Sequence, residues 1–141
     1  MDKGLAPLRV ILGFSLLSTT LHYTHNTVRY ADYPQLRGVS PLAGGIAVAL
    51  AWVVLTTFGW FGYRAYTHGR YHRALAFLLV YSLSGMLTLG HFLTGVPRLP
   101  AFWFATIFTD AAAGLALWVF LTWAWARFNR VTTRDQVSTL H

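Results

Sequence analysis

Two histidines and an asparagine lie close together near the end of the first apolar stretch. His22 and His25 are three residues apart, and Asn26 follows His22 by four residues. Side chains three or four residues apart share one face of an α-helix, so we expect these three on a common face. Imidazole rings bind transition metals and transfer protons near neutral pH. The spacing predicts a polar site but does not identify its chemistry.

Two further residues could join this site from other parts of the chain. His91 lies near the end of the third apolar stretch, and Asp110 lies within the fourth. A carboxylate inside a bilayer costs roughly 3 kcal/mol unless it faces the bundle interior and is paired. Small residues follow Asp110 at positions 111–114 and would let another helix come close. We therefore expect Asp110 to be buried against a partner, and a histidine is the natural one.

These residues must be positioned by elements that lie in a membrane. Of the 141 residues, 55% are hydrophobic and only 11% are charged, whereas soluble domains average about 25% charged residues. Four apolar segments are long enough to cross a bilayer, over residues of about 8–28, 41–63, 74–94 and 101–127. We predict an all-α integral membrane protein with one domain over residues 1–128 and a polar cytoplasmic tail over 129–141.

The connections between the predicted spans are short and carry turn signals. Pro34 and Gly38 break the chain after the first span, and Ser40 followed by Pro41 is a helix-start signal. Tyr33 in this connection is expected at the membrane–water interface, where aromatic residues gather. Short connections predict that sequential helices pack antiparallel as one up-down four-helix bundle.

The distribution of Lys and Arg predicts the orientation of the bundle. The N-terminal segment, the connection after the second span and the C-terminal tail hold eight of the 11 Lys and Arg residues: Lys3, Arg9, Arg64, Arg70, Arg73, Arg127, Arg130 and Arg134. The opposite side has only Arg29, Arg37 and Arg98. Because cytoplasmic loops carry the excess of positive charge, both termini are predicted to be cytoplasmic.

This orientation predicts that the candidate residues share one layer. At the helical rise per residue, His22 and His25 lie about 12 and 7 Å below the outer end of the first span. His91 lies about 6 Å below the end of the third span, and Asp110 about 13 Å below the start of the fourth. The outer half of the bilayer would therefore contain all four side chains, with Asn26 in the same layer.

The preferred hypothesis is a metal site formed by His22, His25, His91 and Asp110, with Asn26 in support. Imidazole nitrogens and a carboxylate oxygen from different helices suit zinc, copper or iron. No complete metalloenzyme motif is present in the sequence, so the spacing alone favours a metal without choosing among these ions.

Three other hypotheses remain open. Asp110 and His91 could act as acid and base on a lipophilic substrate, as an isomerase or cyclase would need. His22 and His91 could ligate haem b, since two histidines on different helices of a four-helix bundle can do so. Finally, the polar residues could be purely structural, in a small accessory subunit of a larger membrane complex.

Composition also limits the partners. The chain has no cysteine, which excludes disulfides, thiolate metal sites and a cysteine nucleophile. The net charge of +7 comes from residues at the ends of apolar spans, where topology and lipid headgroups explain it without nucleic acid. The expected partners are the bilayer of a plasma or inner membrane, and a second copy of the chain or a larger complex.

Overall fold

The described part of the chain is entirely helical in its regular structure. The computed structural model describes the backbone of residues 4–34 and 38–138, and the side chains of these residues as far as Asn129. In chain order the elements are α1 (Leu5–Val28), η1 (Tyr30–Asp32), α2 (Pro41–Thr67), α3 (Tyr71–Met86), η2 (Leu87–Gly90), α4 (His91–Thr94) and α5 (Ala101–Ser138). The elements η1 and η2 are 3₁₀-helices.

Four helical segments of this described part are long and apolar enough to cross a membrane, as predicted. Three of them coincide with α1, α2 and the first part of α5, and the third span, Tyr71–Thr94, combines α3, η2 and α4. Their outer surfaces carry large apolar side chains: Leu42 is 75% exposed, Leu93 89% and Val119 69%. Surfaces of this kind suit contact with lipid tails rather than water.

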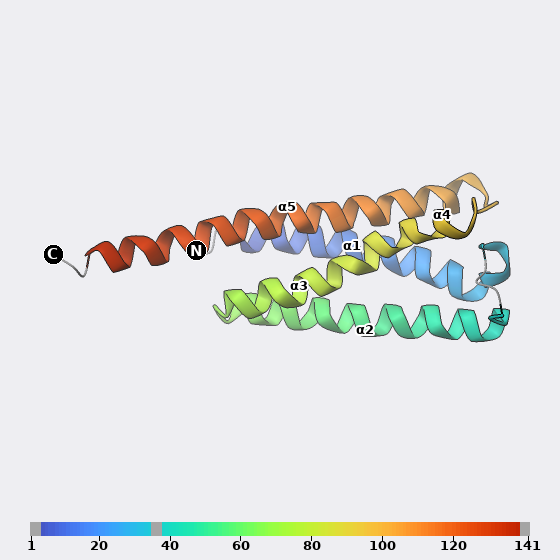
Figure 1. Ribbon diagram of the computed structural model, residues 1–141, viewed down its shortest axis with the longest axis horizontal. Helices are drawn as coiled ribbons and strands as arrows, with labels where there is room; N and C mark the ends of the chain where they lie inside the picture. Colours follow the sequence, from blue (N-terminus) through green and yellow to red (C-terminus); the bar gives the residue numbers. More distant parts are fainter. Residues whose placement is uncertain (1–3, 35–37, 139–141) are drawn as a thin grey trace.

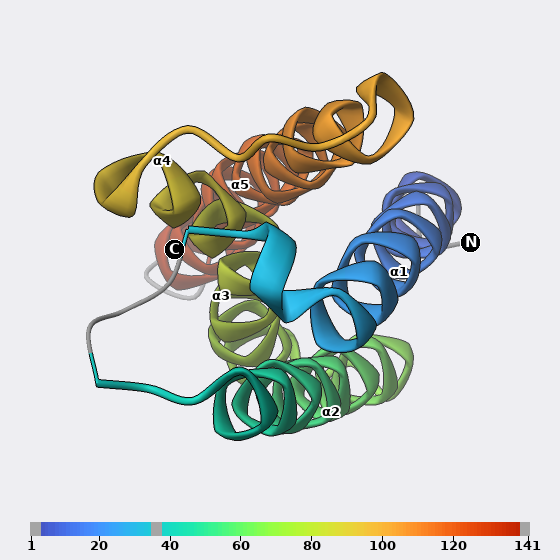
Figure 2. The same cartoon turned by 90° about the vertical axis from the view of Figure 1, so that its right-hand side faces the viewer.

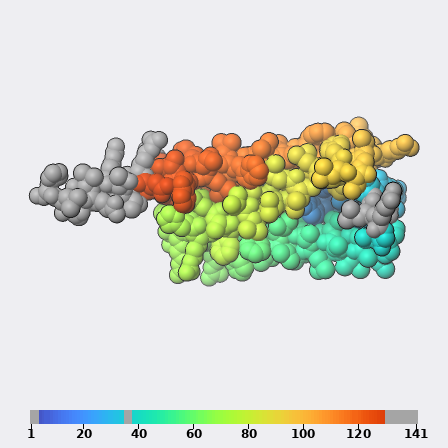
Figure 3. Space-filling view, in the orientation of Figure 1, coloured from blue at the N-terminus to red at the C-terminus, as the bar shows by residue number. Residues whose placement is uncertain are grey.

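The four spans form a bundle in which consecutive spans run in opposite directions (Figure 1). Seen end-on, α1 and α3 each pack against both α2 and α5 (Figure 2). The space-filling view shows α2, α3 and α5 along one long side of the molecule (Figure 3). Helix α1 begins, α2 meets α3, and α5 ends at the same end of the bundle, which we call the arginine end. The other end, where α1 ends and α5 begins, is the histidine end.

The predicted helix boundaries are right at some ends and wrong at others. Helix α2 begins at Pro41, and Ser40 Oγ accepts a hydrogen bond from the backbone N–H of Ala43 over 3.3 Å, as an N-cap does. The same helix continues to Thr67, beyond the predicted end at about residue 63. Helix α5 continues to Ser138, beyond the predicted end at about residue 127. No proline or glycine follows residue 114, so nothing in the sequence stops α5 where its apolar pattern ends.

The third span is not a continuous α-helix, which the sequence analysis did not predict. Thr88 Oγ1 donates to the carbonyl oxygen of Gly85 over 2.6 Å, within the turn where α3 gives way to the four-residue 3₁₀ segment η2. A 3₁₀-helix turns about 20° more per residue than an α-helix. Four such residues rotate the following turn by roughly 80°. The direction of the His91 side chain is therefore set by η2.

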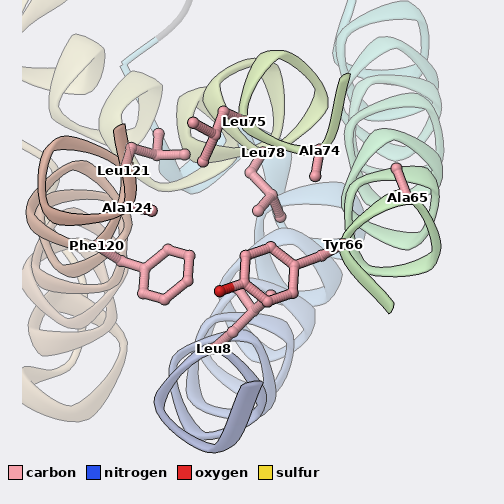
Figure 4. Close-up of a cluster of buried hydrophobic side chains, with 9 residues drawn as sticks. All are labelled: Leu8, Ala65, Tyr66, Ala74, Leu75, Leu78, Phe120, Leu121 and Ala124. Carbon is pink, nitrogen blue, oxygen red and sulfur yellow. The ribbon is translucent and has the colours of Figure 1, made fainter. Parts of the chain in front are cut away.

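The apolar core lies in the half of the bundle nearer the arginine end. Leu8, Leu78 and Ala124 are all fully buried, and aromatic rings from α2 and α5 pack against them. Figure 4 shows these side chains converging from all four spans. Gly85 in α3 lies against the Asp110 carbonyl and Gly114 of α5, where a Cβ would clash with the backbone. The small-residue segment 111–114 thus permits the close approach that its composition predicted.

Candidate functional site

Helix α5 holds the buried ring of His22 in one tautomer. His22 is 1% exposed, and its Nδ1 lies 2.9 Å from Oγ1 of Thr106. The Thr106 hydroxyl donates its own proton to the carbonyl oxygen of Trp103 over 2.6 Å, so its oxygen accepts from His22. Nδ1 therefore carries the ring proton and Nε2 carries a bare lone pair. No group in the described part of the chain donates to this buried Nε2.

His91 of α4 faces His22 across the bundle. The centroids of the two imidazole rings are 5.5 Å apart. Asn26, one turn after His22 on α1, donates from Nδ2 to His91 Nε2 over 3.1 Å. The Asn26 Oδ1 atom is buried, and no partner for it exists among the described residues. His22, Asn26 and His91, which we call the His22–His91 site, thus hold two buried acceptor atoms without donors.

Tyr33 covers this site from the connection after α1. Its ring centroid lies 4.9 Å from that of His91 and 5.8 Å from that of His22. The side chain is 3% exposed, so its ring faces the interior of the bundle and not its outer surface. Burial raises the pKa of the Tyr33 hydroxyl, and the carboxyls of Asp110 and Asp32 raise it further. The hydroxyl therefore stays protonated at neutral pH and can donate a hydrogen bond.

His25 points to different neighbours from those of His22. Its Nδ1 lies 2.8 Å from the Tyr33 hydroxyl, and its ring stacks on Trp103 with centroids 4.1 Å apart. A separation of three residues leaves two side chains about 60° apart around the helix axis. That difference directs His25 toward Tyr33 and Trp103, while His22 faces Thr106 and His91.

Asp110 is fully buried as predicted, but its partner is not a histidine. Ser18 Oγ donates a hydrogen bond to Asp110 Oδ1, and Thr109 Oγ1 lies 2.7 Å from the same Ser18 Oγ. The only ion pair among the described residues joins Arg29 and Asp32, so Asp110 has none. The second carboxyl oxygen, Oδ2, is buried without a hydrogen-bond partner in this part of the chain.

The antiparallel register of α1 and α5 explains why Asp110 and His22 do not meet. Thr106 of α5 lies opposite His22 of α1. Moving four residues back along α1 and four forward along α5 reaches the next pair, Ser18 and Asp110. One helical turn, about 5.4 Å along the axis, thus separates the carboxylate from the imidazole.

The four predicted ligands do not form one metal-binding set. Among the residues whose placement is described, no three His, Cys, Asp or Glu side chains are arranged to hold a metal ion. The predicted set of His22, His25, His91 and Asp110 therefore divides into the His22–His91 site, the His25–Tyr33 pair and the Asp110–Ser18 pair. Nitrogen and oxygen donors remain together at His22, Asn26 and His91.

Two side chains that the sequence analysis did not select take part in the site. Thr106 lies four residues before Asp110, on the same face of α5, so the position of Asp110 could have indicated it. Tyr33 lies in an irregular connection, and no periodic pattern predicts where such a residue folds back.

A haem between His22 and His91 would require the site to rearrange. A porphyrin between His22 and His91 would have to displace the Tyr33 ring that lies against both imidazoles. It would also break the hydrogen bond from Asn26 to His91. An ion would also need the Asn26 amide to turn away from His91 Nε2, but it would leave the Tyr33 ring in place, and the lone pair of His22 Nε2 is already free. The acid–base hypothesis also lacks a direct contact, since Asp110 is bonded to Ser18.

Comparison with known proteins gives no further indication of function. No protein-family model, no curated protein sequence and no solved structure matches this chain.

Proposed function

We propose that this chain is a polytopic membrane protein that binds a transition-metal ion through His22 and His91. The observation that carries the proposal is the bare Nε2 of His22, which is buried and has no donor among the described residues. A buried lone pair without a donor costs about 1–3 kcal/mol. A cation at this position would remove that cost.

The hydrogen bond from His22 Nδ1 to Thr106 supports a ligand role. Metal-binding histidines nearly always donate their second ring N–H to a protein oxygen, which fixes the tautomer and the ring orientation. Thr106 Oγ1 is such an acceptor for His22. A buried structural histidine would also bond its N–H, so the unusual feature is the combination of a fixed Nδ1–H with a bare Nε2.

The donor set favours zinc, copper or iron. His22 offers a free imidazole nitrogen, and a rotation of the Asn26 amide would free the Nε2 of His91 and turn the unpartnered Asn26 Oδ1 toward it. Imidazole suits these ions, whereas calcium and magnesium prefer sites built from oxygen alone. Three neutral ligands would leave a metal ion its full positive charge and an open position for a water or substrate ligand.

In the proposed orientation both termini are cytoplasmic, in a plasma or inner membrane. The N-terminal segment, the α2–α3 connection and the C-terminal tail carry eight of the 11 Lys and Arg residues. The bias of positive charge toward the cytoplasm then puts the His22–His91 site in the outer half of the bilayer.

Metal content and a visible spectrum of the purified protein would test the proposal. The protein should be purified in mild detergent, without chelator and without a metal-affinity step. We expect one metal ion per chain, lost in His22→Ala and in His91→Ala. His25→Ala should retain the ion, because Tyr33 and Trp103 already engage His25. His72→Ala, at the arginine end, is the matched control.

Three results would contradict the proposal. Loss of metal in His25→Ala equal to that in His22→Ala would restore the larger ligand set. A Soret band would show haem instead of a simple ion. A colourless, metal-free protein from metal-replete cells would favour an acid–base enzyme or an accessory subunit.

A further inference from the structure

A basic cavity lies between α2 and α3 at the arginine end, far from the His22–His91 site. Its volume is about 700 Å³. Its polar lining consists of Arg64, Arg70, Arg73 and His68, and two aromatic rings, Phe61 and Phe77, form its apolar side. The four basic side chains are exposed, and Phe61 is 47% exposed.

The turn between α2 and α3 brings the three arginines together. Gly69 has a φ of +70°, a left-handed conformation that glycine adopts without steric cost. The backbone N–H of Arg70 then donates to the carbonyl oxygen of Ala65 over 2.9 Å, which folds the chain back on itself. His68 Nδ1 lies 2.7 Å from the carbonyl oxygen of Arg64 and closes the end of α2.

The positive charge of this cavity is not neutralised within the described part of the chain. None of the three guanidinium groups makes a hydrogen bond or ion pair with a described side chain. The two carboxylates in this part are engaged elsewhere: Asp32 with Arg29, and Asp110 with Ser18. The cavity therefore presents to a ligand from outside three guanidinium groups that have no partner among the described side chains.

We propose that this cavity binds the phosphate headgroup of an anionic membrane lipid. The inference rests on the spans crossing a membrane, because Arg64 and Arg73 then lie where α2 and α3 reach the headgroup layer. Guanidinium groups bind phosphate oxygens in pairs, and three of them suit a phosphate monoester with two negative charges. Phe61 and Phe77 would lie beside the start of the acyl chains.

The lipid that remains with the protein would test this inference. The protein should be reconstituted in phosphatidylcholine vesicles with small, equal amounts of phosphatidic acid and phosphatidylglycerol. It should then be extracted gently, and the retained lipids measured by mass spectrometry. We expect enrichment of phosphatidic acid, which carries a phosphate monoester, over both other lipids. A basic side chain beside an anionic headgroup contributes about a fivefold preference, so Arg73→Gln, which removes a guanidinium from the cavity, should lower the enrichment about fivefold.

Two control variants separate a lipid site from a purely topological role. Arg98→Gln removes one exposed charge at the histidine end and should leave the enrichment unchanged. The triple variant Arg64→Lys, Arg70→Lys and Arg73→Lys retains the charges that set topology. It should nevertheless lose several-fold in preference for phosphatidic acid, because lysine lacks the paired donors of arginine.

Several outcomes would overturn the inference. The first is equal retention of phosphatidic acid and phosphatidylglycerol by the natural chain. The second is a loss of phosphatidic acid enrichment in Arg98→Gln as large as that in Arg73→Gln. The third is an undiminished enrichment of phosphatidic acid in the triple lysine variant. Inorganic phosphate that displaced phosphatidic acid at millimolar concentration would show that the site takes a soluble phosphate instead of a lipid.

Discussion

The arginine half of the bundle packs apolar side chains, whereas the histidine half buries polar side chains whose hydrogen-bonding capacity is only partly used. The first half contains Leu8, Leu78 and Ala124, all fully buried, in one continuous core. The second contains His22 and Asn26, each with a buried acceptor that lacks a partner among the described residues. Helices α1 and α5 contribute to both halves, whereas the histidine half also takes His91 from α4 and Tyr33 from the connection after α1.

The proposed function divides stability and binding between the two halves. Unpaired buried polar atoms destabilise a fold, and they persist where the surrounding structure holds them in place. Here α1 and α5 are fixed against their neighbours by the apolar half. The histidine half can then retain bare lone pairs for a ligand.

The largest effect is expected for Gly85→Leu, which would push α3 away from α5. A Cβ at this position meets the carbonyl oxygen of Asp110 and the backbone nitrogen of Gly114. We expect loss of the folded protein or a strongly lowered midpoint of thermal unfolding in detergent. Gly13→Ala is the control, because no other atom lies within 4 Å of a Cβ there. Equal effects of the two substitutions would contradict the packing described for α3 and α5.

Leu78→Ala tests the apolar half directly. Leu78 is fully buried and contacts the core from α3. Truncating a buried leucine costs about 2–5 kcal/mol in soluble proteins, through lost packing and a residual cavity. In a bilayer the packing part of that loss remains, so we expect a drop of about 2 kcal/mol. Equilibrium unfolding in mixed detergent would measure it, and a change below the error of that measurement would show that this cluster does not stabilise the bundle.

His22→Leu should have the opposite effect on stability from Leu78→Ala. It removes a buried ring nitrogen without a described partner, at the loss of one hydrogen bond to Thr106. The two contributions are each about 1 kcal/mol and of opposite sign, so metal-free protein should keep its stability or gain slightly. Metal binding should be lost. Destabilisation as large as that of Leu78→Ala would place His22 in the structural core instead.

The smallest effect on metal binding is expected for Tyr33→Phe, which removes the hydroxyl near His25 and retains the ring over His22 and His91. Loss of one hydrogen bond costs about 1 kcal/mol. The substitution should leave the metal content unchanged, because neither His22 nor His91 bonds to the hydroxyl. Loss of metal in Tyr33→Phe would show that the hydroxyl is itself part of the site.

The same variant should change the response to alkaline pH. Because burial raises the pKa of Tyr33, the folded state holds this proton more tightly than the unfolded state does. The resulting stability is fully present below the ordinary tyrosine pKa of about 10 and is lost as the pH rises through the folded-state value. Tyr33→Phe should therefore lose less stability than the natural chain between neutral and strongly alkaline pH. Parallel curves for the two proteins would contradict the burial of Tyr33.

The sequence was sufficient to predict the helical bundle because the relevant signals are local. Apolar length identified four spans, and Ser40 with Pro41 marked the start of α2. The predicted end of α5 was wrong, because an apolar pattern indicates where a helix leaves the bilayer and not where the helix ends. The break in the third span depends on Thr88 and Gly85, whose hydrogen bond a periodic pattern does not reveal.

The candidate site was only partly predictable, because its details depend on how helices pack against one another. The spacing on α1 brought His22 and Asn26 to one place, and the depth count brought His91 near them. The prediction that a histidine partners Asp110 was wrong, because the register of α1 against α5 puts Ser18 opposite Asp110. Tyr33 was missed because its place over the histidines comes from an irregular connection.

X-ray absorption at the edge of the bound metal would test the central claim most directly, because it counts ligands by type. Metal-loaded protein should show two imidazole nitrogens, which belong to His22 and His91, together with oxygen ligands. The spectrum of His25→Ala should be the same as that of the natural chain. Three imidazoles, or a spectrum that changes in His25→Ala, would contradict the two-histidine site, and the absence of any imidazole would contradict the proposed function.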